Sequence, residues 1–307
     1  LLLLAVGIMS SVATVFSSIT DISNPTKIAC RLQMTALTLF VLQLHTWFTN
    51  RSQCIDLWRD HFAEVVIAGA CFSLSLLVFT VGLEHTTMSH CLILASTGPL
   101  FMLAYKLSNG HHTTKFEYAG VGLSLAGIIL ISFAYEAESK ATWYGDLLSL
   151  GYAVFYTMFL IISNRVVNEA DMPVLPYFFA INFVGCWVAF LSMVLFCPRE
   201  LGVFFTWMTS DDFAAIAYLA IFPGIFGHLT FNILLRHVST FLITVFSSLE
   251  APFGSFVGWC FGYQEIPPLV TWLGGTLLIT GCAAVTLGGM KVDEKYRLLP
   301  TKEIEID

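Results

Sequence analysis

Charged side chains are scarce in this sequence of 307 residues. Asp, Glu, Lys and Arg together make up 11% of the chain, whereas a soluble domain carries about 25% of them. The net charge of −7 is modest, and the sequence holds no basic cluster large enough to indicate a nucleic-acid partner. With 57% hydrophobic residues, the chain has more apolar surface than a soluble core can bury. We therefore expect the lipid bilayer to be its solvent.

Sequence motifs of catalysis and metal binding are missing as well. The chain contains no GxSxG, no HExxH, no P-loop and no dinucleotide-binding glycine pattern. Its eight cysteines are scattered, mostly within apolar runs, and no CxxC or Cys/His spacing indicates a metal site. We interpret them as small buried thiols. The sequence thus predicts a protein that is not an enzyme and has no cofactor.

Long apolar runs dominate what is present. A helix needs about 20 apolar residues to cross about 30 Å of hydrocarbon, and continuous rather than alternating runs favour helices over strands. The fold class predicted is therefore an all-α integral membrane protein with about ten transmembrane helices. The spans are placed at 1–22, 26–48, 62–83, 87–106, 117–134, 143–163, 175–197, 212–235, 239–262 and 269–290.

The distribution of Lys and Arg among the predicted loops gives the orientation. Cytoplasmic loops carry an excess of these residues, and here alternate loops hold ten on one side against three on the other. Both termini should therefore face the cytoplasm. The glycosylation triplet Asn50-Arg51-Ser52 then lies on the cytoplasmic side, and we expect Asn50 to be unmodified.

The chain also contains a weak internal repeat. The repeated elements are Ser96-Thr97-Gly98-Pro99, Gly120 and Gly127 in one half, and Leu249-Glu250-Ala251-Pro252, Gly274 and Gly281 in the other. The spacing from proline to glycine is 21 and 22 residues, and the two glycines are seven apart in both halves, which places them on one helix face and permits close helix contact. Two units of five spans must insert with opposite orientations, as in many secondary transporters. The predicted divisions are a first five-helix repeat at 1–137, a second at 138–290 and a cytoplasmic tail at 291–307.

Several short motifs, taken in order, resemble the EamA-like branch of the drug/metabolite transporter superfamily. They are Arg31, Gly145-Asp146-Leu147-Leu148, Gly227-His228, Phe231-Asn232, Glu250-Ala251-Pro252, and Gly274 to Gly281. The resemblance covers nearly the whole chain and implies ten helices in two inverted EamA-like repeats around a central solute cavity. Glu265 fits an acidic position that such proteins often carry before the tenth span, but the first half has no equivalent, so the second half is the better match.

Two ionisable residues inside predicted spans are candidates for a substrate-binding site, because charges in hydrocarbon usually face a cavity or a partner. Glu250 precedes Pro252, which frees backbone carbonyls. Its carboxylate can couple proton movement to transport or hold a cationic solute; alternatively it braces the kink. Arg31, about one turn into its span, can anchor an anion; alternatively it snorkels to the interface or pairs with Asp21.

The remaining substrate-site candidates are polar or aromatic: His228, Asn232, Asn182, Tyr152 and Tyr156. His228 and Asn232 are four residues apart and share a helix face, so they can present donors and acceptors to a solute. Hydrogen bonding between helices is the alternative for both, and for Asn182. The two tyrosines either line a cavity or pack against lipid and core.

These features together predict a secondary transporter that moves a small organic solute or metabolite by alternating access. The alternative is a non-transporting membrane regulator or scaffold that acts through its cytoplasmic tail. In that tail, Glu294 followed by Leu298-Leu299 resembles an acidic dileucine sorting signal, although it also fits an ordinary charged tail. The signal would bind sorting adaptors and direct the protein to the plasma membrane or to an endosomal or lysosomal membrane.

Overall fold

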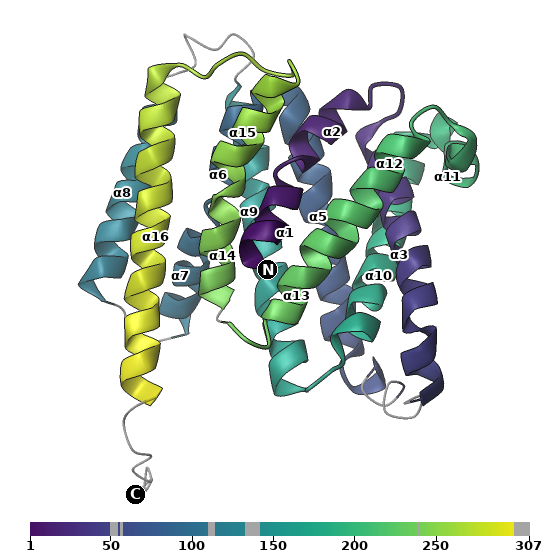
Figure 1. Ribbon diagram of the computed structural model, residues 1–307, viewed down its shortest axis with the longest axis horizontal. Helices are drawn as coiled ribbons and strands as arrows, with labels where there is room; N and C mark the ends of the chain where they lie inside the picture. The colour runs from purple at the N-terminus through teal and green to yellow at the C-terminus, as the bar shows by residue number, and fades with distance from the viewer. Residues whose placement is uncertain (50–54, 56–57, 110–113, 133–141, 239, 298–307) are drawn as a thin grey trace, which may run out of the picture.

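The computed structural model describes residues 1–49, 55, 58–109, 114–132, 142–238 and 240–297, and every regular element among them is a helix (Figure 1). The first part of the chain forms α1 (Leu2–Met9), α2 (Val12–Ser18), α3 (Asn24–Thr49), α5 (Phe62–His85), α6 (Met88–Ala95), α7 (Gly98–Ser108) and α8 (Lys115–Ser132). The second part forms α9 (Trp143–Asn164), η2 (Arg165–Glu169), α10 (Val174–Phe196), η3 (Pro198–Glu200), α11 (Val203–Thr206), η4 (Trp207–Thr209), α12 (Phe213–Leu219), η5 (Ala220–Leu229), α13 (Thr230–Leu234), α14 (Thr240–Ser248), α15 (Glu250–Cys260) and α16 (Leu269–Arg297).

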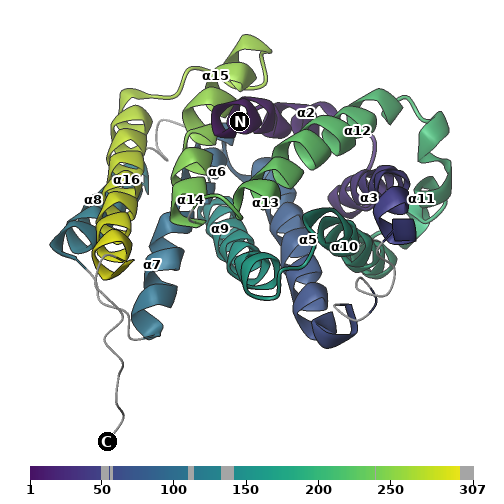
Figure 2. The same cartoon turned by 60° about the horizontal axis from the view of Figure 1, so that its bottom comes forward.

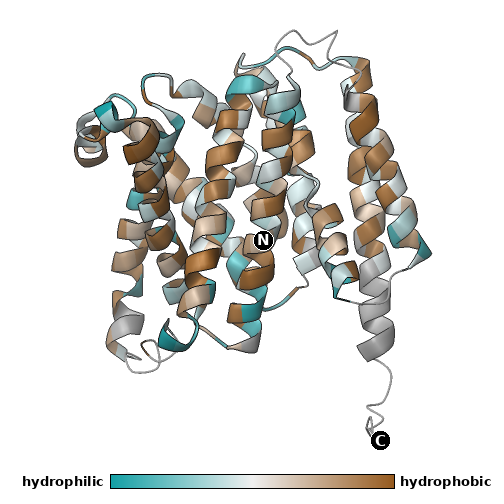
Figure 3. Ribbon diagram, turned by 180° about the vertical axis from the view of Figure 1, so that it is seen from behind, coloured by the Kyte–Doolittle hydropathy of each residue, from teal (hydrophilic) through white to brown (hydrophobic). Residues whose placement is uncertain are grey.

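Six helical segments in the described part of the chain are long and apolar enough to cross a membrane. They are Asn24–Leu44, Phe62–His85, Met88–Ser108, Trp143–Asn168, Val174–Phe196 and Phe213–Leu234. Hydrophobic residues run along most of the helices (Figure 3), and large apolar side chains such as Phe40, Trp187 and Leu195 remain exposed on the outside. This pattern fits a multi-pass protein in lipid. Each of the ten predicted spans overlaps a helix, but ten crossings and an inverted repeat stay predictions.

Breaks divide three of the predicted spans into shorter helices. The first span divides at Ser10 and Ser11, the fourth at Ser96 and Thr97, and the ninth at Leu249. Prolines account for the last two breaks, because Pro99 and Pro252 lack the N–H that would continue the helical hydrogen bonds. The two short proline motifs that repeat in the sequence therefore mark two interrupted helices.

The helices α8 and α16 lie side by side at one end of the molecule (Figures 1 and 2). A Cβ atom added to Gly120 would lie 2.5 Å from the carbonyl oxygen of Gly281, and one added to Gly127 would lie 2.6 Å from that of Gly274. These pairs run in opposite directions along the sequence, so the two helices are antiparallel. The glycines that repeat in the sequence thus contact one another and let the two backbones touch.

The segment η5 is a π-helix that interrupts the helical run from α12 to α13. It contains Pro223, which removes one backbone donor, and Gly224, where an added Cβ would lie 3.0 Å from the Thr35 hydroxyl oxygen. Thr35 also donates to the carbonyl oxygen of Ala220 at 3.3 Å. This close contact fixes η5 against α3, and it places His228 in the interior.

A carboxylate in the short helix η3 holds the start of α3. One oxygen of Glu200 accepts hydrogen bonds from the backbone N–H of Ser23 at 3.0 Å, the Ser23 hydroxyl at 2.8 Å and the Thr26 hydroxyl at 2.5 Å. Burial by itself raises the pKa of Glu200, but these hydrogen bonds and the nearby charge of Lys27 leave that pKa below its ordinary value. The connection after α10 is thereby attached to the connection before α3.

Some of the sequence predictions concern residues that the structure does not describe. The triplet at Asn50 and the residues Leu298 and Leu299 lie outside the described residues, as does the boundary at residues 137 and 138. The helix α16 continues to Arg297, so Glu294 is helical. The helix therefore continues beyond the last predicted span, which ends at residue 290, and the cytoplasmic tail at 291–307 stays a prediction.

Candidate functional site

A cavity of about 40 Å³ lies near the middle of the molecule, between α1, α2, α5, α6, α7, α9, η5, α14 and α15. Its polar lining residues are Ser96, Tyr152, Tyr156, His228, Thr244, Ser247 and Glu250. The rest of the wall is apolar, including Met9, Leu76 and Phe79. A water molecule needs about 10–15 Å³ of such volume, so the cavity holds about three waters.

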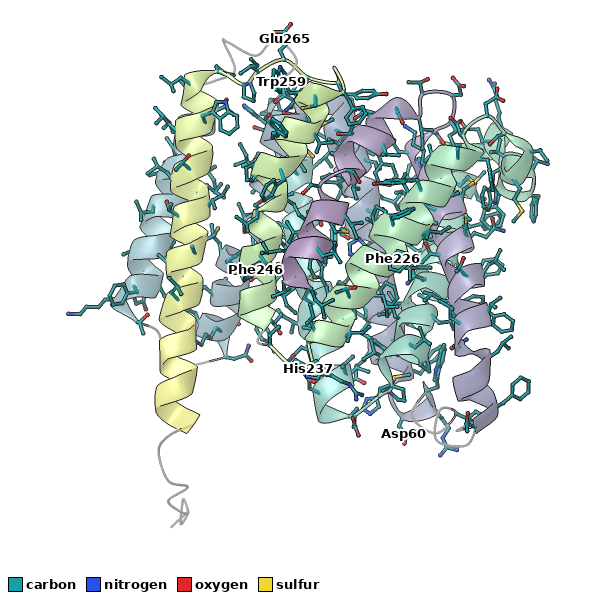
Figure 4. All side chains as sticks on the ribbon, in the orientation of Figure 1. Asp60, Phe226, His237, Phe246, Trp259 and Glu265 are labelled. Carbon is teal, nitrogen blue, oxygen red and sulfur yellow. The ribbon has the colours of Figure 1, made fainter. Side chains whose placement is uncertain are left out.

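The depth of the cavity can be followed in Figure 4. Phe246 on α14 lies roughly halfway between Glu265 at one end of the molecule and Asp60 at the other. Ser247 and Glu250, which line the cavity, follow Phe246 within four residues. The polar groups therefore gather at mid-depth, where an isolated polar side chain facing hydrocarbon would be costly.

One wall of the cavity is aromatic and comes from α9 and η5. Tyr152 and Tyr156 are one helical turn apart on α9, and their rings stack with centroids 5.4 Å apart. The Tyr156 hydroxyl lies 3.4 Å from Nδ1 of His228, and Phe72 supports the imidazole edge-on at 5.0 Å. Nε2 of His228 is buried and has no hydrogen-bond partner among the described residues. This wall therefore offers a stacking surface together with an unsatisfied polar atom.

The cavity wall also contains Glu250, the first residue of α15. It directly follows the helix break at Leu249, and a helix N-terminus favours a negative charge. Within the described residues no basic side chain forms an ion pair with Glu250. Its carboxylate therefore faces the cavity without a protein counter-charge.

Arg31 lies close to this site but does not line the cavity. Its side chain is buried, and none of its three guanidinium nitrogens has a hydrogen-bond partner in the described part of the chain. It stacks over Phe16 at 5.4 Å and lies within electrostatic range of Tyr152 and His228. Arg31 follows the start of α3 by seven residues, about 10 Å along the helix. No ion pair joins Arg31 to Asp21 among the described residues.

The two asparagine candidates lie outside the cavity wall. Asn232 donates to the carbonyl oxygen of His228 at 2.9 Å, and its own side-chain oxygen is buried without a partner among the described atoms. Asn182 donates to the carbonyl oxygen of Phe178 at 2.7 Å, within its own helix α10. Asn232 thus lies one turn behind the site, whereas Asn182 is separate from it.

Sequence reasoning did not assign Ser96, Thr244 and Ser247 to the site. Ser96 stands in the first of the two repeated proline motifs, so the repeat carried a signal that could have identified it. Thr244 lies about two turns and Ser247 about one turn before Pro252, in an apolar run with no distinctive spacing. Both belong to α14, which ends directly before the helix break at Leu249.

Comparison with known proteins shows which proteins this chain is similar to. Residues 143–287 match the EamA-like transporter family. The Escherichia coli K12 protein named "Uncharacterized inner membrane transporter YedA" is 24% identical over 212 residues, which cover 69% of this chain and 64% of that protein. Mouse solute carrier family 35 member F5 is 29% identical over 114 residues, 36% of this chain and 21% of its own. These matches span less than two thirds of the relatives' own lengths.

The fold itself is similar to that of a solved structure. A protein known from a crystal structure superposes with a TM-score of 0.66 at 16% identity, over 94% of this chain and 96% of its own. The family match lies in the second half of the chain, as expected from Glu250, Glu265 and the later glycines. The chain is therefore a homologue of YedA that carries an EamA-like transporter family domain in residues 143–287.

Proposed function

We propose that this protein is a secondary transporter that moves a small organic solute or metabolite across a membrane by alternating access. The observation that carries the proposal is the cavity at mid-depth, where Tyr152, Tyr156, His228 and Glu250 converge from three separate helical segments. Buried polar groups without partners are costly, and a solute would satisfy them. The family match and the transporter names of the two relatives support the same conclusion.

The size of the cavity indicates what must move before a solute can bind. A space for about three waters is too small for an organic metabolite, so solute entry requires the cavity walls to separate. The helix breaks at Ser96 and Leu249 lie beside the cavity, where a change in a few backbone angles would tilt α7 or α15. Hinges of this kind commonly allow one bundle to move against another around a central site.

Residues behind the wall have supporting roles in this proposal. Arg31 would become reachable when Phe16 moves off its guanidinium, and it would then bind a negatively charged group of the solute. Asn232 would hold the His228 backbone in place. Asn182 packs within its own helix, so we expect its replacement by alanine to affect transport least among the predicted site residues.

Transport by reconstituted protein tests the proposal. The purified chain in liposomes would be offered radiolabelled amino acids, nucleobases, nucleotide sugars and organic cations. We expect uptake of at least one class, reduced about tenfold or more by Glu250→Gln or by His228→Ala, because each loses about 1.4 kcal/mol or more of solute interaction. Arg199→Gln, which removes one charge from an exposed position, is the control. Absence of uptake for every class, or full uptake by both site variants, would contradict the proposal.

The same proposal includes an orientation and a destination. With both termini cytoplasmic, a cysteine introduced at Asp60 into a variant that lacks the eight native cysteines should react only with cytoplasmic reagents, and one introduced at Glu265 only with reagents from the opposite side. The tail residues Glu294, Leu298 and Leu299 would bind sorting adaptors for the plasma membrane or endosomal and lysosomal membranes. Replacing both leucines by alanine should then change the location of the protein but not its transport activity in liposomes.

A further inference from the structure

Two short helices begin at the cavity, and only one of them carries a carboxylate there. α7 begins at Gly98 and α15 begins at Glu250, and both residues line the cavity. Thr97 precedes Pro99 by two residues, just as Glu250 precedes Pro252. A helix N-terminus favours a negative charge. Glu250 supplies that charge to α15, whereas α7 has no acidic residue in its first turn.

The first turn of α7 is not capped by a side chain either. Thr97 directly precedes α7, but its hydroxyl donates to the carbonyl oxygen of Leu94 at 2.7 Å and does not cap the helix. The partial positive charge of this helix end therefore reaches the cavity at Gly98, where no side chain intervenes. Helix ends of this kind bind carboxylates and other anions, and in membrane transporters they often face an anionic group of the substrate.

A second, independent group in the cavity wall also calls for a negative partner. The Tyr156 hydroxyl lies 3.4 Å from Nδ1 of His228 and has no other acceptor among the described residues, so it donates to Nδ1 and leaves the hydrogen of the neutral imidazole on Nε2. Nε2 is buried and has no partner in the described part of the chain. Arg31, whose guanidinium is likewise without a partner there, lies within electrostatic range of His228. A donor inside a positive field favours a carboxylate.

Glu250 gives the same cavity a negative group. Within the described residues no basic side chain pairs with its carboxylate, which lies within electrostatic range of Tyr152 and Tyr156. The rings of these tyrosines stack with their centroids 5.4 Å apart, and an aromatic face attracts a cation. The carboxylate and the ring faces together favour an ammonium group.

The two opposite charges of this region do not neutralise one another. Tyr152 lies within electrostatic range of both Arg31 and Glu250, yet no ion pair joins the two among the described residues. A buried charge without a partner costs several kcal/mol. A solute with only one charge would leave the other charge unmatched, and an uncharged solute would leave both. A molecule that carries both charges would match each of them and would bring no net charge into the membrane.

We propose that the solute is a zwitterion with one ammonium and one carboxylate group, as in an amino acid. The ammonium group would bind the Glu250 carboxylate beside the tyrosine pair. The carboxylate would lie between the N-terminus of α7 and Nε2 of His228, with the charge of Arg31 behind it. The inference rests on the proposed function and names its substrate class.

Thermal unfolding of the purified chain tests this charge preference without a transport assay. The probes are the common amino acids, each compared with the amine that lacks its carboxylate and the acid that lacks its amino group, at equal concentration, ionic strength and pH. We expect at least one amino acid to raise the unfolding temperature, because it binds the native state. The matching amine and acid should need about tenfold higher concentrations or more for the same rise, since each lacks one charged contact.

Two variants assign the charged groups separately. Glu250→Gln should weaken binding of the amino acid about tenfold and leave binding of the acid without an amino group unchanged. His228→Phe should weaken binding of the amino acid and leave binding of the amine without a carboxylate unchanged. The control Ser75→Ala removes a buried hydroxyl that bonds within α5 and should respond as the wild type does.

Three results would overturn the inference: no stabilisation by any amino acid, an equal response to one of the two singly charged analogues, or a reversed assignment in the two variants. Uptake into liposomes separates this inference from the proposed function. Uptake of anions, cations or uncharged solutes without uptake of any amino acid contradicts the zwitterion and leaves the transporter proposal standing. Absence of all uptake counts against that proposal, and the unfolding comparison then still decides which charges the cavity binds.

Discussion

The contact between α8 and α16 makes a sharp prediction, because two glycines on α8 differ only in what surrounds them. A Cβ atom at Gly127 would lie 2.6 Å from the Gly274 carbonyl oxygen and 2.7 Å from the backbone nitrogen of Leu278, whereas a Cβ at Gly122 would meet nothing within 4 Å. Real side-chain carbons do not approach a backbone so closely, so Gly127→Ala must push the two helices apart. Gly122→Ala adds a methyl group that faces outward.

The magnitude follows from a comparison of the two variants. Each gains about 1 kcal/mol from replacing glycine by alanine within a helix. Only Gly127→Ala also has the cost of overpacking, about 1–3 kcal/mol. The difference between the variants isolates that cost, and we expect Gly127→Ala to be the less stable by about 1–3 kcal/mol.

Thermal unfolding of both purified variants in the same lipid nanodiscs measures the difference. The wild type should unfold at or below the temperature of Gly122→Ala, and Gly127→Ala clearly below that of Gly122→Ala. A double variant with an alanine at Gly120, which would meet the Gly281 carbonyl oxygen at 2.5 Å, should be less stable still. Equal unfolding temperatures for Gly127→Ala and Gly122→Ala would refute the close contact between the helices.

Two further predictions concern single charges. Glu200→Gln should lower the unfolding temperature at pH 7 by about 2–4 °C through loss of about 1 kcal/mol. Because the pKa of Glu200 is lowered by folding, its contribution is fully present above about pH 4.3 and is lost progressively as pH falls through the lowered pKa of the folded state; a difference from wild type that does not diminish as pH falls below that value would count against it. Arg31→Met should raise the unfolding temperature, since an unpaired buried charge is removed, and should reduce transport; a lower unfolding temperature would show that Arg31 has a partner.

The sequence predicted the placement of the helices because the apolar runs are long and their joints carry charge or proline. It also predicted that the repeated glycines lie on close helix faces. It could not name their partners, since Gly120 meets Gly281 only through tertiary packing. The positions of the helix breaks could be predicted, because Pro99 and Pro252 remove helical hydrogen-bond donors. Whether a proline bends or interrupts a helix, however, depends on what replaces the lost hydrogen bond.

Part of the candidate site could also be predicted from the sequence. Glu250 and Arg31 stand out as charges in apolar runs, and the structure brings Glu250 to a cavity. Arg31 lies deeper than its sequence position suggested, because α3 begins at Asn24 and not at residue 26. The depth and direction of Asn182 and Asn232 depend on helix rotation, which the uniformly apolar sequence around them does not reveal.

The π-helical segment η5 determines how the structure would respond to the deletion of a residue. A wide turn of this type holds one residue more than the regular helix would, and in a regular helix each residue turns the chain by about 100°. Deleting one residue between Pro223 and His228 would therefore return the segment to a regular helix and leave the imidazole near Tyr156, whereas a regular helix of unchanged length would rotate the imidazole away from Tyr156 by about 100°. The residue count of this segment, as well as its composition, determines whether the aromatic wall is complete.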